Sequence, residues 1–177
     1  MSGSSAVLLG IILGLMMCFD LGGPVNKAAY LFATAGLSTG DESSMQIMAA
    51  VMASGMVAPI ALSLATFIRK SLFTPAEQEN GKSAWLLGLS FVSEGAIPFA
   101  AADPFRVIPS MMAGGAVTGA ISMALSVGSR APHGGVFVFF AIDPFWGYLV
   151  AIAAGVVVST AAVLAMKQFW PNKAVEE

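Results

Sequence analysis

The chain has 177 residues, of which 57% are hydrophobic and 10% are charged, and its formal net charge is −2. Soluble domains carry roughly 25% charged residues, so this composition predicts an all-α integral membrane protein with one membrane domain, and the absence of a basic block excludes a nucleic-acid partner. One cysteine and one histidine exclude an internal disulfide and a zinc site. No phosphate-binding glycine loop or nucleophile motif supports a soluble enzyme, and no metal or cofactor is expected.

The first apolar segment is short. Residues 5–19 are uncharged but fall below the ~20 residues that a bilayer crossing needs. Gly10 and Gly14 have the spacing that allows two helices to approach closely. Cys18 is expected to be a small packed side chain. Without a basic leading region or a cleavage site, the segment is not expected to be a signal peptide.

A polar break follows at residues 20–27, where two glycines and a proline must interrupt the helix. A second, moderately apolar piece covers residues 28–37. Two short pieces around such a break predict a re-entrant hairpin or a discontinuous helix, which is tolerated at membrane depth where it lines a cavity or is covered by protein. The alternative is an ordinary loop between two weakly marked spans.

Three later segments are long enough to cross a membrane: residues 45–68, 107–129 and 144–166 are all free of charge. Gly115 and Gly119 again indicate close helix packing. Between the first two spans, residues 71–83 form a polar segment in which Thr74 is expected to cap a helix that has Pro75 in its first turn. Residues 130–135 form a polar turn between the last two spans.

Glu94 is the ionisable residue of the apolar run 84–102, where it lies between Ser93 and Gly95, with Pro98 just beyond. A charge at the bilayer centre costs at least ~3 kcal/mol on insertion scales, so an intramembrane acid indicates a functional site. The alternative is a structural acid that is hydrogen-bonded to a neighbouring helix or lies in a water-exposed loop.

The basic residues predict the topology. Arg69, Lys70 and Lys82 place the 71–83 segment in the cytoplasm. If residues 84–103 crossed the membrane, the later basic residues would mostly fall outside, whereas a hairpin that enters and returns keeps most of them inside. We therefore expect a re-entrant hairpin with Glu94 near its tip, and a cytoplasmic C-terminus.

Three sequence stretches carry a family resemblance: FVSEGAIPFAAADPFRVIP at residues 91–109, DLGGPVNKAAY at residues 20–30 and APHGG at residues 131–135. In this order they closely resemble the fructose-specific membrane component, enzyme IIC, of the bacterial phosphoenolpyruvate-dependent sugar phosphotransferase system (PTS). Family domains are longer, with additional N-terminal helices. The chain therefore looks like the C-terminal, sugar-binding half, without the N-terminal scaffold helices and the IIA and IIB domains.

The resemblance implies a multi-pass protein of the bacterial inner membrane that carries fructose or a similar hexose by an elevator-like movement. It also implies a phosphorylated IIB partner, whose cysteine transfers the phosphoryl group, within a phosphohistidine–fructose phosphotransferase complex. A homodimer would form through the missing N-terminal helices. By analogy with related permeases, Glu94 would contact the sugar hydroxyls near the phosphorylation site.

A hexose site needs several hydrogen-bond donors and acceptors held on broken helices. Glu94 is expected to accept or orient the attacking hydroxyl, as its catalytic role. Asp103 and Arg106 are expected either to pair structurally or to act as a gate or phosphate contact. The expected sugar-binding residues are Asp20, Gly22, Gly23, Asn26, Ser93, Glu94, Gly95, His133 and Gly134.

Two other functions fit the same features. An ion- or proton-coupled secondary transporter of a small polar solute would also place a carboxylate on a broken helix. Alternatively, the chain is an inactive, truncated permease subunit.

Overall fold

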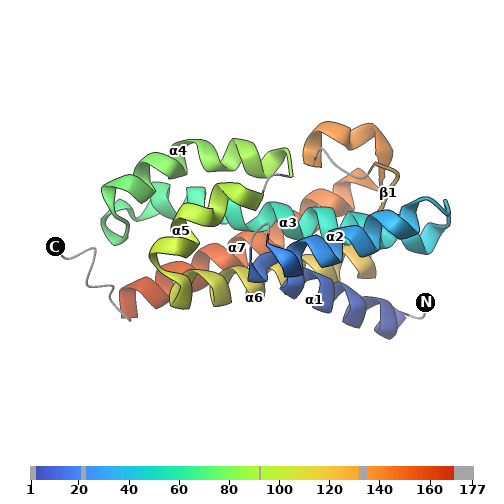
Figure 1. The fold of residues 1–177 in the computed structure, drawn as a ribbon, viewed down its shortest axis with the longest axis horizontal. Coiled ribbons are helices and arrows are strands. Elements are labelled where there is room, and N and C mark those ends of the chain that lie inside the picture. The colour runs from blue at the N-terminus through green and yellow to red at the C-terminus, as the bar shows by residue number, and fades with distance from the viewer. Residues whose placement is uncertain (1–2, 21–22, 92, 132–134, 170–177) are drawn as a thin grey trace.

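The structure is a computed structural model that describes residues 3–20, 23–91, 93–131 and 135–169. The described residues form a helical bundle with one very short two-stranded sheet (Figure 1). In chain order the elements are α1 (Gly3–Phe19), α2 (Pro24–Leu37), α3 (Glu42–Ile68), η1 (Lys70–Leu72), α4 (Pro75–Leu89), η2 (Ser93–Ala96), α5 (Ile97–Ala102), α6 (Pro104–Ala124), β1 (Gly128–Ser129), η3 (Gly135–Ala141), β2 (Ile142–Asp143) and α7 (Phe145–Phe169).

Helices α3, α6 and α7 are each long and apolar enough to cross a membrane. They overlap the three predicted spans, which confirms a predominantly helical chain with three helices able to span a membrane. The predicted end of the second span was wrong: α6 stops at Ala124, and the chain then turns through Ser126, which has a φ of 56°. The apolar residues that follow belong to this turn and to β1, because apolarity alone does not mark where a helix ends.

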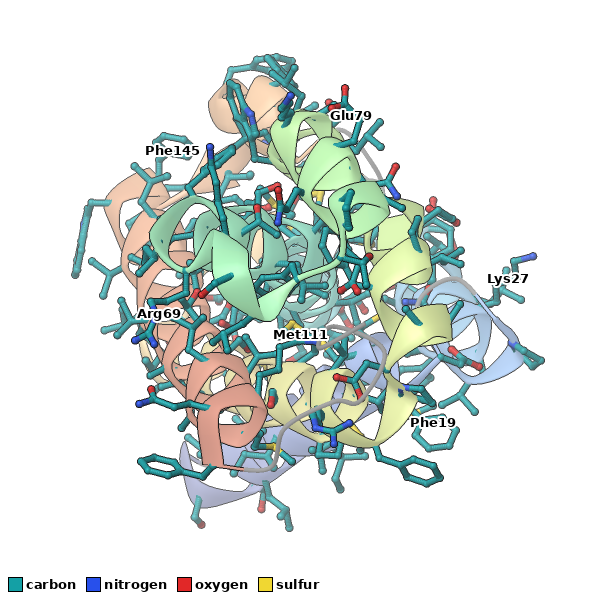
Figure 2. All side chains as sticks on the ribbon, turned by 90° about the vertical axis from the view of Figure 1, so that its left-hand side faces the viewer. Phe19, Lys27, Arg69, Glu79, Met111 and Phe145 are labelled. Atoms are coloured by element: carbon teal, nitrogen blue, oxygen red, sulfur yellow. The ribbon has the colours of Figure 1, made fainter. Side chains whose placement is uncertain are left out.

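Helix α3 is the centre of the bundle. Every residue from 48 to 59 is buried, and α1, α2, α4, α6 and α7 all pack against it. Figure 2, a view along the bundle, shows Met111 of α6 in the interior and Phe19 on the rim, pointing outward. A helix that is apolar on all sides is stable where other helices surround it.

Helices α1 and α6 cross with their backbones in contact, as the glycine spacing predicted. A Cβ atom on Gly14 would overlap the carbonyl oxygen of Gly115, and one on Gly10 would overlap that of Gly119. Cys18 is buried beside Gly115, and its Sγ donates a hydrogen bond to a backbone carbonyl of α3 at 3.4 Å. Small residues thus replace side-chain packing with close backbone contact between these two helices.

Two pairs of shorter helices enter the bundle from opposite ends (Figure 1). Helix α1 runs from the end where the N-terminus lies to the middle of the molecule, and α2 runs back toward that end. Helix α4 runs from the opposite end to the middle, and α5 turns back toward that end before α6 begins. The predicted cap of α4 is confirmed: the Glu77 backbone N–H donates to Thr74 Oγ1 at 3.3 Å, and Pro75 occupies the first turn.

A small β clasp closes the loop between α6 and α7. Strands β1 and β2 pair antiparallel, and Gly128 faces Asp143. The clasp is extended by Arg130, whose backbone N–H donates to Ala141 O at 3.0 Å and whose Nη2 donates to Phe140 O at 3.0 Å. The clasp lies beside the first turn of α3, because Gly128 lies next to Met45.

Candidate functional site

The Glu94 turn joins two helices that end and begin within a few residues. Helix α4 stops at Leu89, and Phe91 takes a positive φ of 69°. Residues 93–96 then form the single turn η2, after which α5 begins with Pro98 in its first turn. Glu94 is exposed on this turn. Gly95 is buried on the opposite side, where a Cβ would lie 3.1 Å from Leu87 Cδ1.

The depth of each helical break can be compared by the residue of α3 that lies beside it. Near the end of α4, a Cβ on Gly88 would lie 2.9 Å from Pro59 Cγ of α3. Near the end of α1, Cys18 donates its hydrogen bond to Ser54 O of α3. These two α3 residues are separated by about 8 Å of helix, at 1.5 Å per residue. The break after α1 and the break after α4 therefore both lie beside the middle part of α3, about 8 Å apart along its axis.

The third polar segment meets the second break directly. Gly135, at the start of η3, has a φ of 61°, and a Cβ there would overlap Leu89 O and lie 2.9 Å from Phe91 N. On another side, the Phe91 ring lies 5.9 Å from the ring of Tyr30 on α2. The tip that precedes Glu94 is thus in contact with both α2 and η3, which brings together segments that are far apart in the sequence.

Asp20 and Asn26 form the first break. The Asp20 carboxylate accepts hydrogen bonds from the backbone N–H groups of Val25 at 2.7 Å and Asn26 at 2.9 Å, so it satisfies the first turn of α2. Asn26 Nδ2 donates to Met17 O at 2.7 Å, which closes α1 onto α2. Gly23 is needed for this approach, because a Cβ would lie 2.7 Å from Asp20 Oδ2.

Some expected site residues cannot be placed. Gly22, His133 and Gly134 lie outside the described residues, and the side chain of Ser93 is likewise not described. Their assignment to a sugar site stays a prediction from the sequence. The described neighbours of these residues, Gly23 and Gly135, lie at two of the breaks above.

A buried cluster of charges lies at the opposite end of the α4–α5 hairpin. Asp103, between α5 and α6, accepts a hydrogen bond from Arg106 Nη1 at 2.6 Å through Oδ1 and one from Lys167 Nζ at 2.8 Å through Oδ2. Glu77 Oε2 lies 3.9 Å from the same Lys167 Nζ. The expected Asp103–Arg106 pair is therefore present, but it belongs to a larger network that joins α4, α6 and α7.

Comparisons with known proteins show what the chain is similar to. The chain is 56% identical over 171 residues to the PTS system fructose-specific EIIB'BC component of Escherichia coli (strain K12), covering 95% of this chain and 30% of that protein. It is 50% identical over 165 residues to the PTS system fructose-specific EIIC component of Haloferax volcanii, covering 93% of this chain and 43% of that protein. Over nearly its whole length, the chain matches a part of fructose-specific PTS EIIC and EIIB'BC components.

A further relative agrees. The fructose-specific EIIB'BC component of Vibrio cholerae serotype O1 is 53% identical over 178 residues, which cover 99% of this chain and 30% of the relative. The chain thus spans less than half the length of each of these EIIC family members. No family model matches the sequence. No solved structure matches the fold.

Two members of the charge cluster, Glu77 and Lys167, were missed as candidate residues in the sequence. Glu77 was hidden because it stands third after the cap residue Thr74, where a glutamate is ordinary at a helix start. Lys167 was hidden because a basic residue at the end of an apolar helix usually marks only the membrane boundary. Burial was the missing information: the Lys167 side chain is 1% exposed and that of Glu77 is 3% exposed.

Glu77 gives a pH-dependent prediction. Burial raises the pKa of Glu77, and the nearby Lys167 charge opposes this without cancelling it. A raised folded-state pKa stabilises the folded chain at low pH, and this contribution is lost as the pH rises through that pKa. Glu77→Gln should remove the dependence and unfold at a higher temperature than the unmodified chain at neutral pH, as measured by thermal unfolding in detergent between about pH 4 and 8.

Glu79→Gln is the matched control, because the Glu79 side chain is 75% exposed on the same helix. It should leave the pH dependence unchanged. A Glu77→Gln variant that unfolds at a lower temperature than the unmodified chain at neutral pH would show that the attraction to Lys167 outweighs the cost of burial.

Proposed function

We propose that the chain is the sugar-binding membrane part of a fructose permease of the PTS. It binds fructose or a similar hexose within the membrane and presents it for phosphorylation by a phosphorylated IIB protein or domain. The observation that carries this function is the exposed carboxylate of Glu94 at a helix break, where α2 and η3 converge, in a chain that matches a part of EIIC components. The chain supplies the sugar site of a phosphotransferase complex, and the phosphoryl donor cysteine belongs to IIB.

The depth of the break supports a site inside the membrane. About 14 Å of helix separates Pro59, beside the α4 terminus, from the end of α3 at Ile68, at 1.5 Å per residue. The midplane of a bilayer lies ~15 Å from either edge of its hydrocarbon core. We infer that α1–α2 and α4–α5 are re-entrant hairpins that enter from opposite sides. Irregular backbone at this depth fits a cavity that binds a polar solute.

Within this site, Glu94 accepts hydrogen bonds from sugar hydroxyls and orients the hydroxyl that attacks the phosphoryl group. Gly95 and Ser93 shape the same turn. The Asp20–Asn26 break and the His133 loop supply further hydrogen-bonding groups. At the Asp20–Asn26 break the carboxylate already caps α2, but its oxygens retain acceptor capacity beyond the two backbone bonds. The site residues in this proposal are Asp20, Gly22, Gly23, Asn26, Ser93, Glu94, Gly95, His133 and Gly134.

The larger assembly follows from the same proposal. The chain corresponds to the C-terminal part of a longer IIC domain, lies in the bacterial inner membrane and has its C-terminus in the cytoplasm. N-terminal scaffold helices would hold a homodimer, against which this part moves as an elevator. For Asp103 and Arg106 the structural role is favoured over a phosphate contact, because both Asp103 oxygens are already bonded within the buried cluster.

The proposal is tested with membrane vesicles that contain the chain together with the rest of its permease. Labelled fructose should accumulate as fructose phosphate only when phosphorylated IIB is supplied. Uptake of unmodified sugar driven by a proton gradient would instead support a secondary transporter. The absence of fructose binding, both with and without the remaining permease segments, would support an inactive subunit.

A further inference from the structure

Lys167 lies near the C-terminal end of α7, and its side chain is buried. Its ammonium bonds Asp103 Oδ2 at 2.8 Å, approaches Glu77 Oε2 at 3.9 Å and lies 4.7 Å from the centroid of the Phe73 ring. Phe73 in turn contacts Phe99 of α5 edge-on, with ring centroids 6.1 Å apart. The Lys167 side chain of α7 thus contacts Glu77 at the start of α4, Asp103 at the C-terminal end of α5 and, through Phe73, Phe99 in the middle of α5.

The charges within the cluster balance. Two carboxylates, Glu77 and Asp103, face two cations, Arg106 and Lys167, and all four residues are buried. Removing Lys167 alone would leave buried negative charge in excess around Asp103, which is strongly destabilising, whereas removing the charges of Lys167 and Asp103 together is far less costly. Glu77 Oε2 has no hydrogen-bond partner among the described residues, so its attraction to Lys167 is the looser of the two contacts.

The cluster lies at the junction between α5 and α6. Asp103 has φ −151° and ψ 66°, which is not helical, and it is the residue at which α5 ends and α6 begins. Its side chain makes no capping bond to α6. Instead, its two carboxylate oxygens accept hydrogen bonds from Arg106 on α6 and Lys167 on α7. These bonds fix the angle between α5 and α6. Glu77 lies at the start of α4, the other leg of the hairpin that carries Glu94.

We propose that Lys167 is a positioning residue for the Glu94 site. Its ammonium holds α4 through Glu77, and the α5–α6 junction through Asp103, against α7, which fixes where the tip of the hairpin lies. Lys167 does not touch the sugar: it acts through the hairpin. The proposal rests on the proposed function for the role of the tip, but the clamp itself can be measured without a sugar.

The clamp is measured as a distance. Spin labels are attached to cysteines at Ala101 of α5 and Gln168 of α7, both exposed, in the full chain with Cys18→Ala. Lys167→Met should broaden the distance distribution between the labels, and Lys167→Arg should restore a narrow one because it keeps the charge. An unchanged distribution in Lys167→Met would overturn the clamp.

The effect on the site is measured in parallel as the Kd for labelled fructose, per folded protein. We expect Lys167→Met to raise the Kd at least tenfold and Lys167→Arg to restore it. Lys82→Met is the control, because Lys82 forms an exposed pair with Glu79, and it should change neither reading. A broadened distribution with an unchanged Kd would overturn the positioning role.

The double variant Asp103→Asn/Lys167→Met separates positioning from stability. It keeps the buried charges balanced, so it should fold even if Lys167→Met does not, yet it lacks the clamp. A fructose Kd above that of the unmodified chain supports the positioning role of Lys167. A Kd equal to that of the unmodified chain, in a stable double variant, refutes this role. If the unmodified chain within its permease binds no fructose, the proposed function fails, while the spin-label distances still decide whether the clamp exists.

Discussion

Glu94→Gln should lower IIB-dependent phosphorylation of fructose by at least about 100-fold, the lower end of what a positioned acid or base contributes. Glutamine keeps the size of the side chain but exchanges a charged acceptor for a neutral amide, which weakens each bond to a sugar hydroxyl. It also cannot orient the attacking hydroxyl by accepting its proton. The measurement is the rate of formation of labelled fructose phosphate in vesicles with phosphorylated IIB in excess.

The fold should not be affected by this change, because Glu94 is exposed on the η2 turn. The recovered amount and the thermal unfolding of the variant should therefore match those of the unmodified chain. Glu79→Gln is the control: it removes an exposed carboxylate from α4, away from the tip, and should retain full activity. Normal phosphorylation by Glu94→Gln would remove this residue from the site.

Gly14→Ala should destabilise the bundle by about 1–3 kcal/mol or more, the usual cost of overpacking. The added Cβ would overlap the Gly115 carbonyl oxygen, which is backbone and cannot rotate away. Relief requires α1 and α6 to separate, which would also disturb Cys18 and its contact with Gly115. The free energy of unfolding in detergent measures this effect, with the fraction of monodisperse protein after extraction as a second reading.

Gly36→Ala provides the matched control on α2. There a Cβ would approach Ser44 Oγ at 3.1 Å, and a side-chain hydroxyl can move. Alanine also favours a helix over glycine by up to about 1 kcal/mol, so this variant should be neutral or slightly more stable. Equal stability of Gly14→Ala and Gly36→Ala would show that the α1–α6 contact is looser than the structure describes.

The broken helices show how far a pattern of residues predicts a local structure. Glycines and proline at residues 22–24, and the Ser93–Gly95 stretch with Pro98, predicted that two helices would stop, since these residues remove or weaken helical hydrogen bonds. The α1–α2 and α4–α5 pairs do run in opposite directions about these points. The end of α6 was predicted incorrectly because apolar residues continue past Ala124 into a turn.

The site needs contacts that no local pattern contains. The Asp103–Arg106 pair could be expected from a spacing of one helical turn. Its partners Lys167 and Glu77 come from helices distant in the sequence. In the same way, nothing near Gly135 in the sequence indicates that its backbone packs on Leu89 and Phe91.

By itself, the sequence determined that the chain is a helical membrane protein with the motifs of fructose-specific EIIC components and that Glu94 stands at a break in an apolar run. Composition, helix-breaking residues and family motifs are local or additive properties, so they can be read along the chain. Only the tertiary structure decided that both breaks lie beside the middle part of α3 and that Lys167 reaches both legs of the Glu94 hairpin. Such contacts depend on how the helices pack around α3. Packing buries Glu77 and Lys167, which by sequence resemble ordinary charges at helix ends, and the buried ion pairs then hold the helices together.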